Sequence, residues 1–224
     1  SGEFPENTTV AFEEAIRLVV ETIEIDVHLT RDKQMVILHD YSVDRTSDGE
    51  GAVADLSLAA IKELDAGSWF HTRFSGARFL TLAETLDLMP KAMKLNVHVK
   101  ETEEDQDDLV SMVVEELERR SLLSTAFVTG NQGVVQAARN VQPEIQICCF
   151  LSVEECRALD CRILQPGNAV VTPELVAEAH KYDIEVNPFF ADDPEEMRRL
   201  MECGVDGILT NYPARLQELL RGTH

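Results

Sequence analysis

The sequence has no long apolar run. None of its apolar segments approaches the roughly 18 residues that a membrane-spanning helix needs, so we expect no membrane span. No secretory signal segment is visible either. The five cysteines are odd in number and lack the spacing of a disulfide framework, which predicts reduced thiols and a cytoplasmic protein.

Basic residues are also scarce, since 20 Lys and Arg stand against 41 Asp and Glu and the formal net charge is -21. Such a charge repels polyphosphate, so we expect neither nucleic acid nor an anionic membrane surface as a partner. The negative net charge still allows a small anion to bind in a pocket that holds a metal ion, because the local charge of the pocket can be opposite to that of the whole chain. The plainer interpretation of the acidity is a set of solvated outer helices.

Short β-rich runs alternate with amphipathic helices along the chain, and a Rossmann glycine fingerprint is absent. This alternation predicts an α/β fold with a parallel sheet, and the number of repeats favours a (β/α)8 TIM barrel formed as a single domain by residues 1–224. The predicted strands are Thr22–Val27, Met35–His39, Lys94–Lys100, Thr125–Thr129, Ile145–Phe150, Arg162–Gln165, Ile184–Asn187 and Gly207–Thr210.

Two regions depart from strict alternation. Tyr41–Phe79 is too long for an ordinary loop, and its short predicted helix, Ser57–Leu64, indicates a small excursion (41–79) over one end of the barrel. The first element is a helix, about Thr8–Val20, and one apolar face of this helix carries Phe12, Ala15, Ile16 and Val19. Such a barrel, in contrast, begins with a strand. We therefore expect a strand before residue 1; one of the eight candidates, of which 162–165 is the weakest, would then lie outside the barrel.

Two predicted strands carry polar side chains on one face. Because strand side chains alternate with period two, Glu24, Asp26 and His28 share a face of the first strand. Asn96, His98 and Lys100 likewise share a face of the strand at 94–100. In a barrel the apolar faces pack against helices and the polar faces point inward, where charges are costly unless they are paired or bound to metal.

These residue types suit the chemistry of phosphate. Glu24 and Asp26 can hold a hard divalent cation that polarises a phosphoryl oxygen. Lys100 can bind phosphate as a point charge, and His39, at the end of its strand, can exchange a proton near neutral pH. The alternatives are structural ion pairing of the two carboxylates with Lys100, and a strand-end histidine at position 39 that bonds to backbone.

Eight motifs occur in the order that is typical of one known family. They are Pro5-Glu-Asn-Thr8, Glu24-Ile-Asp-Val-His-Leu-Thr30, His39-Asp40, Asp44-Arg-Thr46, Leu64-Asp-Ala-Gly-Ser-Trp-Phe70, Thr81-Leu-Ala-Glu84, Asn96-Val-His-Val-Lys100 and Gly204-Val-Asp-Gly-Ile-Leu-Thr210. With these residues the chain resembles the glycerophosphodiester phosphodiesterases over nearly its whole length. The resemblance implies a TIM barrel with an inserted excursion after the third strand. It also implies hydrolysis of a small phosphodiester substrate to an alcohol and glycerol 3-phosphate, with Ca²⁺ or Mg²⁺.

The resemblance also implies roles for individual residues. Glu24 and Asp26 become metal ligands, and His39 becomes one of two catalytic histidines. Glu6 and Lys100 are expected to line the phosphate site. Asn96 is a further candidate for substrate binding, with backbone bonding in a loop as its alternative.

Three departures from the family pattern qualify these roles. The family's His-Arg-Gly motif, which carries its other catalytic histidine, is not in the sequence, and we expect the native chain to extend before Ser1. His98 occupies the position of the family's third metal carboxylate; either this softer ligand shifts the site towards Mn²⁺, Zn²⁺ or Fe, or it does not ligate. Phe189 and Asp192 replace a Trp and an Asn, which predicts a different leaving-group pocket with Phe190 as a further apolar wall.

Other functions stay open at this point. One is a catalytically degenerate family member that binds a phosphorylated ligand, and another is an unrelated barrel hydrolase that uses paired carboxylates on sugars. For a phosphodiesterase, the resemblance favours attack by the substrate's neighbouring hydroxyl over attack by activated water. The sequence specifies neither the head group nor the oligomeric state. Trp69 and Phe70 are expected in the excursion's own small core rather than against substrate.

Overall fold

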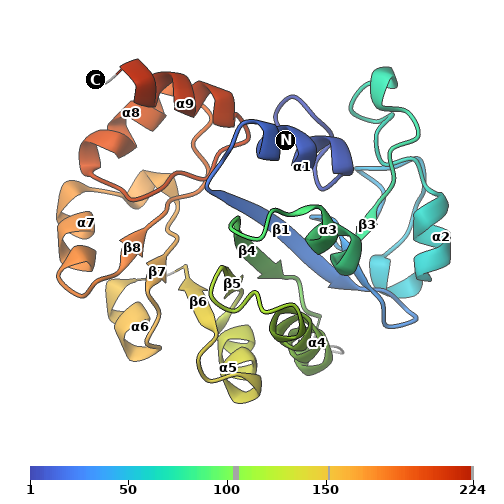
Figure 1. The fold of residues 1–224 in the computed structure, drawn as a ribbon, viewed down its shortest axis with the longest axis horizontal. Helices are drawn as coiled ribbons and strands as arrows, with labels where there is room; N and C mark the ends of the chain where they lie inside the picture. Colours follow the sequence, from blue (N-terminus) through green and yellow to red (C-terminus); the bar gives the residue numbers. More distant parts are fainter. Residues whose placement is uncertain (103–105, 151, 223–224) are drawn as a thin grey trace. The chain divides into compact units, whose positions relative to one another are not determined.

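The computed structural model describes residues 1–102, 106–150 and 152–222, and they form an α/β fold with an eight-stranded sheet (Figure 1). The chain divides into two compact units. The first comprises residues 1–128 and 132–145, and the second comprises residues 129–131 and those from 146 onward. The single domain expected for residues 1–224 stays a prediction, and each unit is described by itself. No helix among the described residues is long and apolar enough to cross a membrane.

In the first unit the strand order is β3-β2-β1-β4-β5. Its elements are α1 (Thr9–Arg17), β1 (Thr22–Leu29), β2 (Met35–Ile37), η1 (Val53–Asp55), α2 (Leu58–Glu63), η2 (Thr72–Phe74), β3 (Leu80–Thr81), α3 (Leu82–Leu88), β4 (Lys94–Val99), α4 (Gln106–Arg119), β5 (Ala126–Thr129) and α5 (Gln132–Val141).

The centre of this unit is the parallel pair β1–β4, in which Thr22 aligns with Lys94 and Val27 aligns with Val99. One face of the pair is apolar and buried, as the period-two pattern predicted. The residues of that face are Ile23, Ile25, Val27, Leu95, Val97 and Val99. Burial of this set holds the two strands in register, because a slip by one residue would turn every apolar side chain to the opposite face.

The prediction of an all-parallel sheet is wrong for β2, which runs antiparallel to β1 and to β3. The physical reason is the length of the connection. Residues 30–34 form a tight turn in which the Thr30 N–H donates to the oxygen of Gln34 at 3.0 Å and Lys33 adopts a φ of 56°. So short a connection can join only antiparallel strands, since a parallel crossover needs about a dozen residues.

The first helix is shorter than predicted. α1 ends at Arg17, and Val19, which was expected on the same apolar face as Phe12, is 81% exposed. Val19 has a φ of 54°, in the left-handed region, so the chain has already left the helix there. Phe12, in contrast, is buried as expected.

The excursion over residues 41–79 is confirmed, and it lies between β2 and β3. α2 starts after Ser57, whose hydroxyl accepts a hydrogen bond from the Ala60 N–H. The excursion has a small core that is continuous with β2: Val36, Leu38, Val43, Val53, Ile61, Ala66 and Phe79. Trp69 packs edge-on against Phe70, and its indole N–H donates to the Ala66 oxygen at 2.9 Å.

The second unit has the parallel strand order β6-β7-β8. Thr172 and Asp193 cap the starts of α7 and α8 with their side chains, and Gly204 ends α8 with a φ of 80°. The five cysteines of the chain are free thiols. The elements of this unit are β6 (Gln146–Cys149), α6 (Val153–Ala158), β7 (Ile163–Leu164), η3 (Asn168–Val170), α7 (Pro173–His180), β8 (Glu185–Val186), α8 (Pro194–Cys203) and α9 (Pro213–Gly222).

One predicted strand is wrong and one strand was missed. Gly207–Thr210 is not a strand. The Leu209 N–H donates to the Pro188 oxygen and the Leu209 oxygen accepts from the Ala191 N–H, but Pro188 has no N–H with which to continue a ladder. Leu80–Thr81 forms β3 instead, and its two residues are too few for a pattern of alternation to be seen.

Gly67 in the excursion is expected to tolerate no side chain. A Cβ there would lie 2.0 Å from the backbone oxygen of Phe74. We expect Gly67→Ala to lower the free energy of unfolding by about 1–3 kcal/mol, because the loop must shift to relieve the overlap. Urea unfolding followed by circular dichroism measures this, with Gly167→Ala as the control because a Cβ there has no neighbour within 4 Å. Equal midpoints for the two variants would contradict the prediction.

Candidate active site

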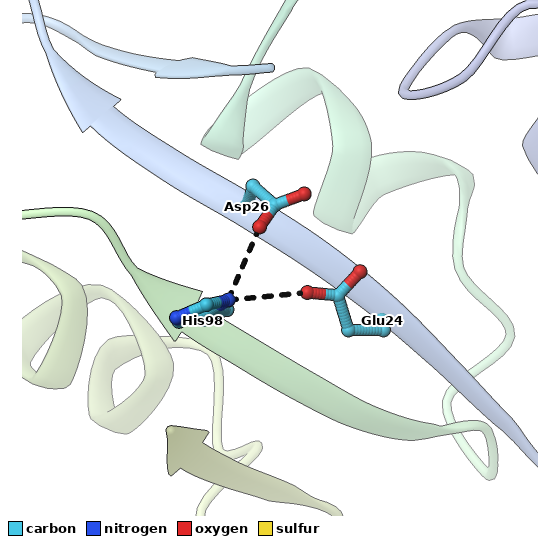
Figure 2. A group of neighbouring side chains, drawn as sticks. All are labelled: Glu24, Asp26 and His98. Atoms are coloured by element: carbon cyan, nitrogen blue, oxygen red, sulfur yellow. Dashed lines mark ion pairs between the residues drawn. The ribbon is translucent and has the colours of Figure 1, made fainter. Parts of the chain in front are cut away.

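The polar face of the β1–β4 pair gathers three side chains that can ligate a metal (Figure 2). Glu24 and Asp26 come from β1 and His98 from β4, where the register sets His98 beside Asp26. His98 Nδ1 lies 3.2 Å from Asp26 Oδ1 and 3.6 Å from Glu24 Oε1. Ligand atoms of all three lie within 4.8 Å of one another, so a single cation can reach each of them.

Two further residues contact Asp26. Lys100, just beyond β4, places Nζ 3.1 Å from Asp26 Oδ1. Asn7 donates from Nδ2 to Asp26 Oδ2 at 3.2 Å. Asn7 has a φ of 55°, in the left-handed region that asparagine tolerates better than most residues. The buried hydroxyl of Thr8 closes this turn by donating to the Pro5 oxygen at 2.6 Å.

The charges in the cluster shift one another's protonation. Burial raises the pKa of Glu24, and the negative charge of Asp26 raises it further. Burial also acts to raise the pKa of Asp26, but the neighbouring His98 and Lys100 lower it to about 2. Burial acts to lower the pKa of His98, yet the two carboxylates outweigh it and the net shift is upward. His98 therefore holds its proton more tightly than an ordinary histidine.

The donor set fits a divalent cation. Asp26 Oδ1 is buried and receives no hydrogen bond of good geometry, although Lys100 and His98 are close to it. Such an oxygen keeps lone pairs for a cation. Two carboxylates with one imidazole suit ions that accept mixed oxygen and nitrogen ligands. The ion pair between Asp26 and Lys100, which was the plainer interpretation of these residues, is present as well.

His39 forms a pair with Asp40 directly after β2. His39 Nδ1 lies 2.7 Å from Asp40 Oδ1, and the His39 side chain is 49% exposed. The Arg45 guanidinium beside Asp40 holds the pKa of that carboxyl well below its usual range. An ionised carboxylate only accepts hydrogen bonds, so Nδ1 of the neutral His39 ring carries the proton and Nε2 is the free nitrogen.

The antiparallel direction of β2 brings His39 towards the carboxylate cluster. The Leu38 N–H donates to the backbone oxygen of Asp26 at 3.2 Å, so His39 follows at the level of the middle of β1. The charge of His39 contributes to the lowered pKa of Asp26. The short β1–β2 hairpin therefore sets the position of His39 along β1.

Glu6 pairs with an arginine of the excursion, and its expected place at the phosphate site stays a prediction. Both of its carboxylate oxygens accept from Arg45, Oε1 at 2.6 Å and Oε2 at 3.0 Å. The chain on either side of Glu6 is held by the excursion and by the cluster. Arg73 donates to the Glu3 oxygen at 3.2 Å, Phe74 packs on Phe4, and Asn7 contacts Asp26.

The remaining predicted residues are placed as follows. Asn96 is buried and aligns with Glu24 in the β1–β4 register. Phe189 lies in the second unit, where its ring packs edge-on against Phe150 and Phe190. Roles for Asn96 and Phe189 in substrate binding stay predictions. His28 is buried, with Nε2 3.3 Å from the backbone oxygen of residue 39.

Three residues at this site had no role in the sequence analysis: Asn7, Asp40 and Arg45. Each belongs to one of the motifs quoted from the sequence: Asn7 follows Glu6, Asp40 follows His39, and Arg45 lies in Asp44-Arg-Thr46. Membership of these motifs was the only sign in the sequence that the three residues belong to the site. The contacts among these side chains cross between separate segments, so they could be found only in the folded chain.

Known proteins resemble this chain over nearly its whole length. Residues 1–215 match the glycerophosphoryl diester phosphodiesterase family. A glycerophosphodiester phosphodiesterase of Caldanaerobacter subterraneus is 34% identical over 99% of this chain and 94% of its own length. An Oleispira antarctica phosphodiesterase, solved with the product sn-glycerol-3-phosphate, is 28% identical with a TM-score of 0.92 over 99% of this chain and 93% of that one. A glycerophosphodiester phosphodiesterase of Agrobacterium tumefaciens shares the fold at a TM-score of 0.85 and 24% identity, over 95% of this chain and 93% of that one.

The fold and the relatives define the class as an α/β-barrel enzyme of the TIM type, with the excursion over residues 41–79 inserted in it. Its relatives are hydrolases of phosphoric diesters. The chain belongs to the glycerophosphoryl diester phosphodiesterase family. The family and fold expected from the motifs are confirmed.

The raised pKa of His98 predicts how metal binding depends on pH. Below that pKa a cation must displace a proton from His98, so affinity is expected to fall by about tenfold per pH unit as the pH decreases. Above it, affinity levels off. Calorimetric titration with Mn²⁺ in buffers of different ionisation enthalpy measures both the affinity and the released proton. A pH-independent affinity that is unchanged in His98→Ala would contradict ligation by His98.

Proposed function

We propose that this chain hydrolyses glycerophosphodiesters to an alcohol and glycerol 3-phosphate, with a divalent metal ion and a histidine acid/base catalyst. The observation that carries the proposal is the triad Glu24, Asp26 and His98, towards which the β1–β2 hairpin brings His39. Membership of the family supports the reaction class. The product complex of the Oleispira relative supports glycerol 3-phosphate as the product that keeps the phosphate.

The proposed metal ligands are Glu24, Asp26 and His98. A bound divalent cation supplies Lewis-acid chemistry, polarising a phosphoryl oxygen and offsetting negative charge in the transition state. Mg²⁺ and Ca²⁺ prefer oxygen ligands, whereas an imidazole favours Mn²⁺ or Zn²⁺. Because His98 stands in the triad, we propose Mn²⁺ or Zn²⁺ ahead of Ca²⁺.

The chain's own residues supply the other requirements of the reaction. Lys100, 11% exposed beside Asp26, provides a positive charge that attracts the phosphate. His39 exchanges a proton with the reacting oxygen at Nε2, since Nδ1 is engaged by Asp40. The exposure of His39 leaves that nitrogen accessible to a small substrate. Glu6 contributes through Arg45, because a carboxylate in direct contact with phosphate would repel it.

Hydrolysis is expected to depend on a divalent cation. Release of choline from glycerophosphocholine should stop in EDTA, because the carboxylates of Glu24 and Asp26 then have no cation to hold against the phosphate. Adding back Mn²⁺, Zn²⁺, Mg²⁺ or Ca²⁺ singly to the stripped protein identifies the ions that restore activity. Activity that survives EDTA would contradict metal dependence. Binding of glycerol 3-phosphate without any turnover would instead support the non-catalytic alternative.

Removal of the His39 imidazole is expected to lower kcat by roughly 100- to 10,000-fold, the usual contribution of a general acid/base. The assay is hydrolysis of glycerophosphocholine and of bis(p-nitrophenyl) phosphate by His39→Ala. His180→Ala is the matched control, because His180 is similarly exposed (45%) and pairs with Asp206 at 2.9 Å in the second unit. The control should keep wild-type activity, and full activity in His39→Ala would exclude His39 as the catalyst.

A further inference from the structure

Arg45, in the excursion, forms ion pairs with two carboxylates, Asp40 and Glu6. Its guanidinium donates to Asp40 from Nε at 2.7 Å and from Nη2 at 2.9 Å. It donates to Glu6 from Nη1 at 3.0 Å and from Nη2 at 2.6 Å. The planar guanidinium thus meets two carboxylates, each through both oxygens, and this two-point geometry fixes orientation as well as distance.

The consequence for Asp40 is a carboxylate that cannot rotate freely. Asp40 Oδ2 accepts a hydrogen bond from Arg45 Nε. Asp40 Oδ1 accepts one from Arg45 Nη2, and it also lies 2.7 Å from His39 Nδ1. The direction in which Asp40 offers Oδ1 to the imidazole is therefore set by Arg45. A lysine at this position would keep the charge but would contact the carboxylate at one point.

Arg45 is itself held in place from its other side. Glu6 occupies the remaining face of the fork, and the guanidinium lies 5.8 Å from the ring centroid of Trp69. One positive charge between two carboxylates leaves a net negative charge around Arg45. That balance disfavours direct capture of a phosphate by this guanidinium, so a positioning role fits the contacts better than a substrate-binding role.

We propose that Arg45 is a positioning residue for His39, holding Asp40 in the one orientation that keeps the proton on His39 Nδ1 and leaves Nε2 for the reacting oxygen. This role rests on the proposed function, since it assumes that His39 is the acid/base catalyst. Arg45 acts through Asp40, and Glu6 completes the arrangement by fixing the guanidinium from the opposite side.

Kinetics of three variants test the proposal. Arg45→Ala is expected to lower kcat by roughly 10- to 100-fold with KM changed less than about threefold, as is usual when a group that orients a catalytic residue is lost. Arg45→Lys should lose a similar factor. Arg120→Ala is the matched control, because Arg120 also bridges two carboxylates, Glu116 and Asp87, away from this cluster. It should keep wild-type kcat.

Three kinetic results would overturn the proposal. The first is wild-type kcat in Arg45→Ala, and the second is a raised KM with unchanged kcat, which would indicate phosphate binding by Arg45. The third is wild-type kcat in Arg45→Lys, which would show that a positive charge at position 45 is enough and that the two-point geometry of arginine is not needed. Thermal unfolding checks that each variant is folded, and Arg45→Lys alone decides the question should Arg45→Ala not fold.

The state of the His39 ring gives a readout that needs no turnover. In ¹⁵N-labelled protein at alkaline pH, with the signal assigned by its loss in His39→Ala, we expect a protonated Nδ1 and an unprotonated Nε2. Arg45→Ala should shift both nitrogens towards an average of the two tautomers, and an unchanged signal would overturn the proposal. If the wild-type protein hydrolyses no glycerophosphodiester, the proposed function fails, while this measurement still decides the role of Arg45.

Discussion

The site depends on the parallel pairing of β1 with β4. Their apolar faces are buried together, which leaves the polar face of each strand turned to the same side. Glu24 and Asp26 then meet His98 at distances of 3.2–3.6 Å. Bringing these charges together is unfavourable without partners, because burial raises the pKa of Glu24 and opposes the ionisation of Asp26. Lys100 and His98 offset that cost in the structure, and a divalent cation would do so more fully.

The second constraint is the short turn after β1. It forces β2 to return antiparallel, and the return carries His39 back to the level of Asp26. The excursion follows, before β3, and it provides Arg45 and the aromatic ring of Trp69. One five-residue connection therefore carries His39 towards Asp26, and the excursion supplies Arg45, which contacts the neighbouring Asp40.

Positive charge stands beside the buried carboxylate of the site although the chain as a whole is acidic. The formal net charge is -21, yet Lys100 and the ring of His98 both lie beside Asp26 in the first unit. Lys100 can attract a small phosphodiester there, whereas a long polyphosphate would meet the repulsion of the remaining surface. The balance of charge is thus consistent with the small substrates named for the relatives.

Much of this protein follows from local rules in its sequence. Period-two alternation assigned Glu24, Asp26 and His98 to the polar faces of their strands, because this pattern depends only on near neighbours. The folded chain alone decided the direction of β2, the loss of the strand expected at 207–210, and the contact of Arg45 with Glu6 and Asp40. The reason is that pairing direction and ion pairs depend on which segments meet in space, and no spacing along the chain encodes that meeting directly.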